Sequence, residues 1–201
     1  MLVLPVMASE SPETDSEIPA VTSDESAVPT EIPAIPAERQ KPLLVDDAGL
    51  LTEEESSALL NKLEDISKRY ENEVAVVTVN SLEGKTAEAY ADDYYDYNGY
   101  GYGENDDGLL LLISMGEREW AISTYGYSHT VAFTDAGLEF ISGQFQSKLS
   151  SGNYADAFNC FADQCDDFLR QAATGEPYDV GNMPSKGKVH PFWLVTDLIV
   201  A

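Results

Sequence analysis

The segment Tyr97-Asn98-Gly99-Tyr100-Gly101-Tyr102-Gly103-Glu104-Asn105-Asp106-Asp107-Gly108 leads directly into Leu109-Leu110-Leu111-Leu112-Ile113, and this join indicates the fold class. The first part combines glycines, tyrosines and acids, which is typical of a surface loop. The second part is a short, continuous apolar run, as expected of a strand buried on both faces of a sheet. Loops at the ends of such strands are where open α/β folds place their sites. We refer to residues 97–108 as the acidic loop.

Helix and strand patterns alternate on both sides of this join. Thr52 and Glu55 form a capping box, and apolar residues then recur at helical spacing up to Tyr70. The β-branched run Val74–Val79 predicts a buried strand. The other predicted elements are a helix over 86–97, a strand over 118–124 that forms a hairpin with 109–114, and helices starting near 134 and spanning about 153–173. This order predicts an α/β fold, a three-layer α/β/α sandwich whose small mixed sheet contains a β-hairpin.

The composition divides the chain into a domain and its extensions. We predict a signal-peptide remnant at 1–8, an acidic Pro/Ser-rich disordered linker at 9–40, one domain at 41–175, a linker at 176–190, and the start of a truncated membrane anchor, or a tail, at 191–201. Aromatic residues favour the anchor, whereas Asp197 argues against it, because a charge inside a bilayer is costly. Any contact with a membrane is therefore expected only through this C-terminal segment.

The charge of the chain excludes one class of partner. The formal net charge is −25, and residues 41–175 alone carry 25 acids and eight bases. Nucleic-acid binding needs a basic surface to hold phosphates, so we do not expect it. An acidic surface favours cations or basic partners, and a solvated surface that serves only solubility is the simpler alternative.

The candidate chemistry depends on oxygen ligands. The sequence contains no GxGxxG before a helix, no GxxxxGK[ST], and no CxxC or HExxH motif. Asp46 ends an apolar segment, Asp106 and Asp107 precede the predicted strand, and Asp135 stands at a helix start. If these segments converge at one edge of the sheet, they form a site for a hard divalent cation, Ca²⁺ or Mg²⁺.

Each of these acids also has a simpler explanation. Asp106 and Asp107 with the following glycine suit an ordinary turn, and Asp135 suits a helix N-terminus. Asp46 can cap the turn that follows it. The two interpretations stay open at this point.

The tyrosines of the acidic loop are candidates for partner binding. Tyr100 and Tyr102 alternate with glycines, and exposed tyrosines supply a large contact area at low entropic cost. A protein or cell-envelope partner would bind there. The alternative is that these rings pack against the domain.

Several segments together resemble the TPM domain family. The resemblance is carried by 45–52, by the strand at 73–79, by Asn105-Asp106-Asp107-Gly108-Leu109-Leu110, by 118–126, and by Phe133-Thr134-Asp135. It covers residues 41–175 and implies a three-layer domain outside the cytoplasm, between a signal peptide and a membrane helix. Some relatives, including plant thylakoid-lumen proteins, are described as acid phosphatases, and some bind divalent cations, calcium in particular. Position by position, it assigns Asp46, Asp107 and Asp135 as the shared acids. The Tyr-Gly repeat departs from relatives, which tend to have a tryptophan and one glycine.

Three hypotheses for the function follow. The first is an extracytoplasmic, membrane-tethered binding module that holds a divalent cation in the acidic loop and serves in interaction or assembly. The second is a metal-assisted phosphatase, in which a cation at Asp46 and Asp107 activates water. The third is a structural adaptor without metal. The residues do not decide whether the chain is an enzyme.

Overall fold

The computed structural model describes residues 38–184. The predicted signal-peptide remnant, nearly all of the N-terminal linker and the C-terminal anchor or tail lie outside the described residues. Within residues 38–184, none of the helices is both long and apolar enough to cross a membrane.

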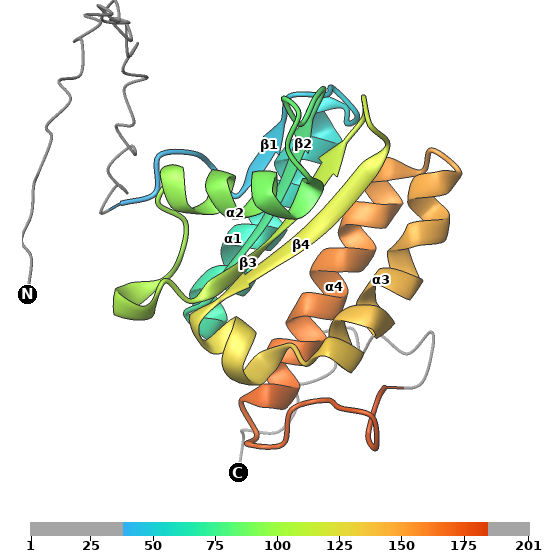
Figure 1. Ribbon diagram of the computed structural model, residues 1–201. Helices are drawn as coiled ribbons and strands as arrows, with labels where there is room; N and C mark the ends of the chain where they lie inside the picture. Colours follow the sequence, from blue (N-terminus) through green and yellow to red (C-terminus); the bar gives the residue numbers. More distant parts are fainter. Residues whose placement is uncertain (1–37, 185–201) are drawn as a thin grey trace, which may run out of the picture. The chain divides into compact units, whose positions relative to one another are not determined.

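The domain is built on one four-stranded mixed sheet (Figure 1). Its strands are β1 (Leu44–Asp46), β2 (Glu73–Val79), β3 (Gly108–Ser114) and β4 (Glu119–Tyr125), in the order β1-β2-β3-β4. β1, β2 and β3 run parallel, and β4 pairs antiparallel with β3 as the predicted hairpin, so that Leu111 faces Ile122. Every residue of β2 and β3 is buried, which confirms the two predicted core strands. β1 is only three residues long, too short to give a strand pattern in the sequence.

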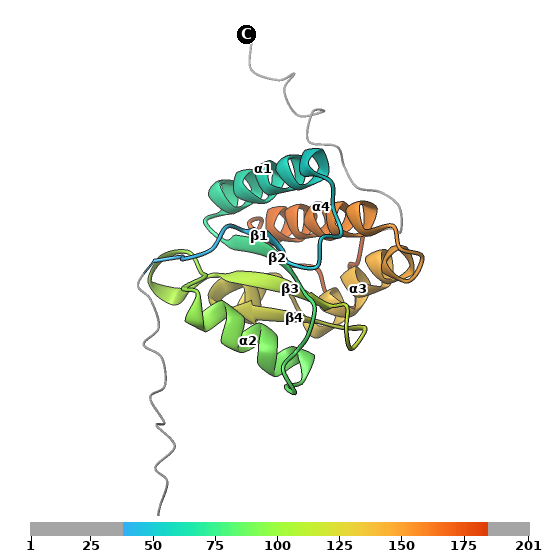
Figure 2. The same cartoon turned by 90° about the horizontal axis from the view of Figure 1, so that it is seen from above.

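Helices cover both faces of this sheet. They are α1 (Glu53–Tyr70), α2 (Ala87–Tyr97), α3 (Asp135–Ser150) and α4 (Tyr154–Ala172). α1 and α4 lie over one face, and α2 lies over the other (Figure 2). α3 packs along α4, and a π-helical turn at Ser128–Ala132 joins β4 to α3. The predicted three-layer α/β/α sandwich is confirmed.

The helix starts follow from local capping. The Thr52 hydroxyl accepts a hydrogen bond from the Glu55 amide at 3.2 Å, and the Glu55 carboxylate accepts one from the Thr52 amide at 2.9 Å. This is the predicted capping box. Thr134 caps α3 in the same way by accepting from the Gly137 amide, so Asp135 is the first residue inside that helix.

The core is apolar and rich in aromatic residues. Phe158, Phe161 and Phe168 on α4 are fully buried, and Phe161 packs edge-on against Phe145 of α3. Each buried ring of this size contributes about 1.5–3 kcal/mol relative to its exposed state. This face of α4 therefore holds α3 and the sheet together.

We expect Gly143→Ala to raise the free energy of unfolding by about 0.5–1 kcal/mol, because glycine inside a helix costs backbone entropy that alanine does not. Gly143 lies exposed in the middle of α3, and a methyl group there would meet no atom within 4 Å. Urea unfolding followed by circular dichroism measures the change. A loss of stability would contradict the helical geometry described for this residue.

Candidate functional site

The acidic loop lies at the amino end of β3, where it is hydrogen-bonded to the sheet. The first residue of the loop, Tyr97, is the last residue of α2, and its last residue, Gly108, is the first residue of β3. The Glu73 amide donates to the Asp107 carbonyl at 2.9 Å, and Tyr102 and Asp107 exchange two backbone hydrogen bonds of 3.0 Å. These bonds hold Asp107 at the start of β3 and join the two ends of the segment 102–107.

Three side-chain contacts fix the rest of the loop. The Tyr100 hydroxyl donates to the Pro42 carbonyl at 2.7 Å, and the Tyr95 hydroxyl donates to the Asp106 carbonyl at 2.9 Å. The Gly101 amide donates to the Glu73 carboxylate at 2.9 Å. The tip, with Glu104, is exposed, so the loop presents its acids from a rigid support.

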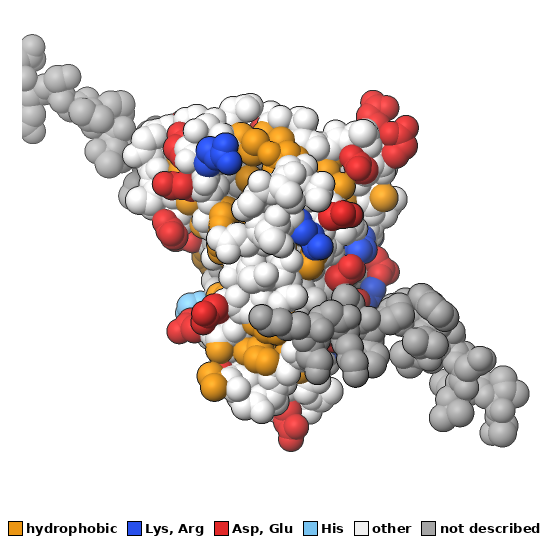
Figure 3. All heavy atoms as spheres, turned by 90° about the vertical axis from the view of Figure 1, so that its right-hand side faces the viewer, with side chains coloured by type: hydrophobic (Ala, Val, Ile, Leu, Met, Phe, Trp, Pro, Cys, Tyr) orange, Lys and Arg blue, Asp and Glu red, His pale blue; other side chains and the backbone are white. Residues whose placement is uncertain are grey.

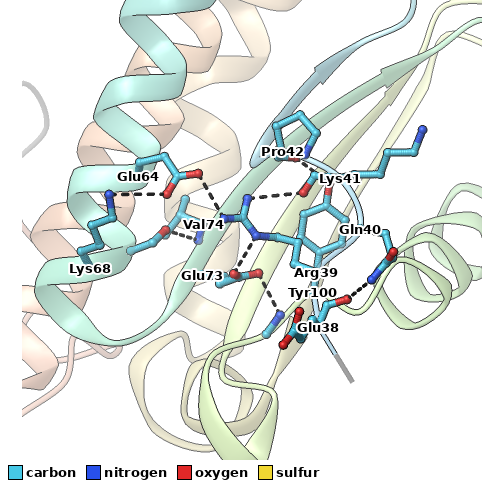
Figure 4. A network of polar contacts seen from close by, with 12 residues as sticks. Glu38, Arg39, Gln40, Lys41, Pro42, Glu64, Lys68, Glu73, Val74 and Tyr100 are labelled. Atoms are coloured by element: carbon cyan, nitrogen blue, oxygen red, sulfur yellow. Dashed lines mark hydrogen bonds and ion pairs between the residues drawn. The ribbon is translucent and has the colours of Figure 1, made fainter. Parts of the chain in front are cut away.

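A buried acid and an arginine form this support (Figure 4). The Glu73 side chain is 10% exposed, and its carboxylate pairs with the Arg39 guanidinium at 3.0 Å. The same guanidinium pairs with Glu64 of α1 at 3.1 Å. Burial raises the pKa of Glu73, while the Gly101 amide and Arg39 act in the opposite direction. Arg39 thus ties the segment before β1 to both α1 and the acidic loop.

Asp107 is positioned by the turn after β4. The Tyr127 amide donates to Asp107 Oδ1 at 2.6 Å. Gly126 has φ = 54°, and a Cβ atom at this residue would collide with Asp107 Oδ1 and lie 2.6 Å from the Asn105 carbonyl oxygen. Glycine is therefore required here, and it lets two oxygen atoms gather over its backbone. Asp107 Oδ2 has no hydrogen-bond partner among residues 38–184.

Further acids surround this point, and no ion pair within residues 38–184 involves Asp92, Asp96 or Asp106. Burial raises the pKa of Asp96, a hydrogen bond from Tyr125 lowers it, and the charges of Asp92 and Asp106 raise it. The Tyr125 ring stacks on Tyr95 with 4.1 Å between centroids. The amino end of β3 is therefore a region of uncompensated negative charge beside a fixed pair of aromatic rings.

Asp46 does not belong to this group, so the expected convergence of the three segments is wrong. Asp46 ends β1 and lies opposite Thr78, near the carboxyl end of β2, whereas Asp107 lies beside Glu73 at the amino end. Because the strands are parallel, the last residue of β1 and the residue before β3 lie at opposite ends of the sheet, offset by six residues or about 20 Å along the strands. The Asp46 carboxylate accepts from the Thr78 hydroxyl at 2.6 Å and from the Leu50 and Leu51 amides. It therefore caps the turn before α1.

The other predicted ligands occupy separate positions at the loop end of the domain. Asp106 is exposed with φ = 52°, and Asp135 is exposed in the first turn of α3. Within residues 38–184, no three acids, histidines or cysteines come together as a metal-binding group. A cation at Asp107 would therefore take few side-chain ligands and would rely on backbone carbonyls and water.

The two tyrosines differ from each other. Tyr100 is 2% exposed and packs against Tyr94 and Tyr95, so the expectation of an exposed Tyr100 is wrong. The glycines on either side let the loop fold inward, and the hydroxyl finds the Pro42 carbonyl. Tyr102 is 41% exposed and stays a candidate for partner contact.

The sequence analysis missed the groups that hold the loop. Glu73 directly precedes the apolar run of β2, and an acid at that place is a signal of a buried ion pair that could have been noticed. Arg39 lies 34 residues earlier, and nothing local connects the two. Gly126 was visible only as part of the TPM resemblance.

Comparisons with known proteins agree with this fold. A family model described as TPM domain matches residues 44–168. The N-terminal domain of a P. gingivalis protein is similar in structure, with a TM-score of 0.57 and 23% identity over 70% of this chain and 88% of that one.

Two further solved structures are similar. The N-terminal domain of the cg2496 protein from Corynebacterium glutamicum has a TM-score of 0.53 and 17% identity over 75% of this chain and 94% of that one. The BA42 protein from Bizionia argentinensis has a TM-score of 0.54 and 15% identity over 66% of this chain and 88% of that one. At these identities the likeness concerns the fold alone. No curated protein matched the chain.

Proposed function

Because the chain belongs to the TPM domain family, we propose that it is a binding module whose acidic loop holds a divalent cation, Ca²⁺ or Mg²⁺, and contributes to interaction or assembly. The observation that carries the proposal is the state of the Asp107 carboxylate. One of its carboxylate oxygens is fixed by the Tyr127 amide at 2.6 Å, and the other has no partner among the described residues. The extracytoplasmic, membrane-tethered setting belongs to the same proposal and is supported by the sequence patterns at 1–8 and 191–201.

The donor set supports a weakly held hard cation. Asp107 and the Asn105 carbonyl approach each other over Gly126, and Asp106 adds an exposed carboxylate next to them. Oxygen atoms of this kind suit Ca²⁺ or Mg²⁺, and Mg²⁺ in particular keeps several waters in such sites. A bound cation would neutralise part of the local charge and offer coordination positions to oxygen atoms of a partner. The exposed ring of Tyr102 lies on the same loop, two residues beyond the buried Tyr100.

We expect the full chain to bind Ca²⁺ with a dissociation constant of about 0.1–1 mM, the range of extracellular modules with few protein ligands. Asp107→Asn should weaken binding at least about tenfold, because it removes the charge of the fixed ligand. Calorimetry and amide NMR shifts at residues 101–108 and 126–127 measure both. Asp156→Asn, an equal charge change on the exposed first turn of α4, is the matched control and should leave the affinity unchanged.

The same samples separate the alternatives. Absence of heat and of amide shifts up to 10 mM metal, with the protein folded, would contradict the cation site and favour the metal-free adaptor. Metal-dependent hydrolysis of a phosphomonoester that persists through purification and disappears in Asp107→Asn would instead support the phosphatase. Hydrolysis that is unchanged in that variant would indicate a contaminating enzyme.

A further inference from the structure

A cavity of about 440 Å³ lies at the other end of β3 from the acidic loop. It is formed between the β3–β4 hairpin and the corner where α3 meets α4. Figure 3 looks onto this side of the domain, and near the top of the view hydrophobic side chains reach the surface beside a basic group. The volume is in the range of small-molecule and cofactor sites.

The apolar part of the lining is preformed. Trp120, Leu149 and Tyr154 line the cavity, and all three are partly buried against the core. The Trp120 ring is held edge-on against Phe145 with 5.4 Å between centroids. A flat or branched apolar group could therefore enter without reorganisation of the lining.

The polar part of the lining consists mainly of hydrogen-bond donors that the protein leaves unused. Within residues 38–184, no hydrogen bond or ion pair engages the side-chain polar atoms of Arg118, the Trp120 indole N–H, the Tyr154 hydroxyl or the Gln146 amide. The other three arginines, Arg39, Arg69 and Arg170, each pair with a carboxylate. Arg118 has no carboxylate partner among residues 38–184, although the chain contains 36 acids, and it lies beside a cavity with a partly apolar lining.

The turn that carries Arg118 is rigid and strained. Arg118 has φ = 60°, a conformation that glycine or asparagine adopts at lower cost. The preceding Glu117 is fixed by the Leu82 amide at 3.2 Å, by the Ser81 hydroxyl at 3.1 Å, and by the Ser114 hydroxyl. These contacts hold the turn and present the guanidinium beside the cavity.

We infer that this cavity binds a carboxylate attached to an aromatic or branched apolar group. Arg118 can hold a carboxylate through two parallel hydrogen bonds, and the neighbouring donors can bond to further oxygen atoms of the ligand. Glu119 also lines the cavity, and the chain is strongly acidic, so a single negative charge suits the site better than a dianionic phosphate. Either a small free acid or the last residue of a peptide carries this chemistry. The inference does not depend on the cation proposal, because the two sites lie at opposite ends of β3.

The test uses the full chain with Trp193→Phe, so that Trp120 is the only tryptophan. N-acetyl-phenylalanine should change its fluorescence and shift the amide NMR signals of 113–120 and 146–154, with a dissociation constant of about 0.5 mM from typical ligand efficiencies. The uncharged analogue, N-acetyl-phenylalanine amide, should bind at least about tenfold more weakly, because its single terminal oxygen carries no charge and cannot form the bidentate ion pair with Arg118.

Arg118→Asn is the decisive variant. Asparagine suits φ = 60°, so this change removes the guanidinium while keeping or raising the thermal stability. We expect at least a tenfold loss of affinity for the acid. Lys41→Gln, an equal charge change on an exposed residue near the other end of the domain, should have no effect.

Three results would overturn the inference: no response to 10 mM acid by the folded protein, equal binding of acid and amide, or unchanged binding by Arg118→Asn. A tripeptide ending in phenylalanine with a free carboxylate identifies the source. Binding as tight as that of the free acid supports a peptide terminus, and binding of the free acid alone supports a small molecule.

Discussion

Replacing Arg39 by methionine should lower the free energy of unfolding by about 2 kcal/mol at pH 7. Removing one partner of a buried ion pair typically costs about 3–5 kcal/mol, and we reduce this because the Arg39 side chain is 24% exposed and the Gly101 amide still supports Glu73. Methionine keeps the apolar part of the side chain, so the change reports mainly on charge. Urea unfolding of the full chain at constant ionic strength measures the loss.

The loss should depend on pH in a definite direction. Burial already raises the pKa of Glu73 above its ordinary value of 4.5, and the charge of Arg39 opposes that rise. Without Arg39 the pKa rises further, so the folded state binds a proton more tightly than the unfolded state does. Stability is then gained as the pH falls through the raised pKa towards 4.5. The difference between the variant and the wild type should therefore shrink between pH 7 and pH 5.

A second substitution tests whether the Glu73 carboxylate causes the loss of stability in Arg39→Met and its pH dependence. In Arg39→Met/Glu73→Gln, the buried carboxylate is gone, while the glutamine oxygen can still accept the Gly101 hydrogen bond. We expect the double variant to be more stable than Arg39→Met at pH 7, with a smaller pH dependence. An equal loss from Arg39→Met at pH 5 and pH 7 would show that packing, and not the charge of Glu73, accounts for the effect.

Elements with strong local signals could be predicted from the sequence. The capping residues Thr52 and Thr134, the β-branched run of β2 and the apolar run of β3 each depend on neighbours within a few positions. The α/β/α layering then follows, because two core strands that alternate with amphipathic helices leave few other arrangements. The structure has these elements at the predicted places.

The candidate site could be predicted only in part, because its contacts are between residues distant in the sequence. Whether Asp46 meets Asp107 depends on the direction in which β1 and β3 run, and neither acid carries that information. The inward turn of Tyr100 depends on a carbonyl acceptor at Pro42, 58 residues away. The donor-lined cavity around Arg118 exists because the α3–α4 corner packs near the hairpin turn, which no local pattern encodes.

Gly108→Ala should destabilise the domain by about 3 kcal/mol, because there is no room for a side chain at this residue, which follows the two acids of the loop. A Cβ atom at residue 108 would collide with the Tyr95 hydroxyl and lie 2.8 Å from the Glu73 carbonyl oxygen. The carbonyl belongs to the paired strand β2, and the Tyr95 ring is 1% exposed and stacked on Tyr125, so neither can move freely. Overpacking of this kind costs about 1–3 kcal/mol, and loss of the hydrogen bond from Tyr95 to the Asp106 carbonyl adds about 1 kcal/mol.

The matched control is Gly143→Ala, the same chemical change at an exposed helical residue, for which we expect the opposite sign. The glycine of the Asp-Asp-Gly sequence would then serve packing, by leaving room for the tyrosine hydroxyl that holds the Asp106 carbonyl in place. Displacement of Tyr95 in Gly108→Ala should also loosen Asp107, so Ca²⁺ affinity should fall even under conditions where the variant stays folded. A Gly108→Ala protein with wild-type stability would show that the Tyr95 contact is not a constraint on this loop.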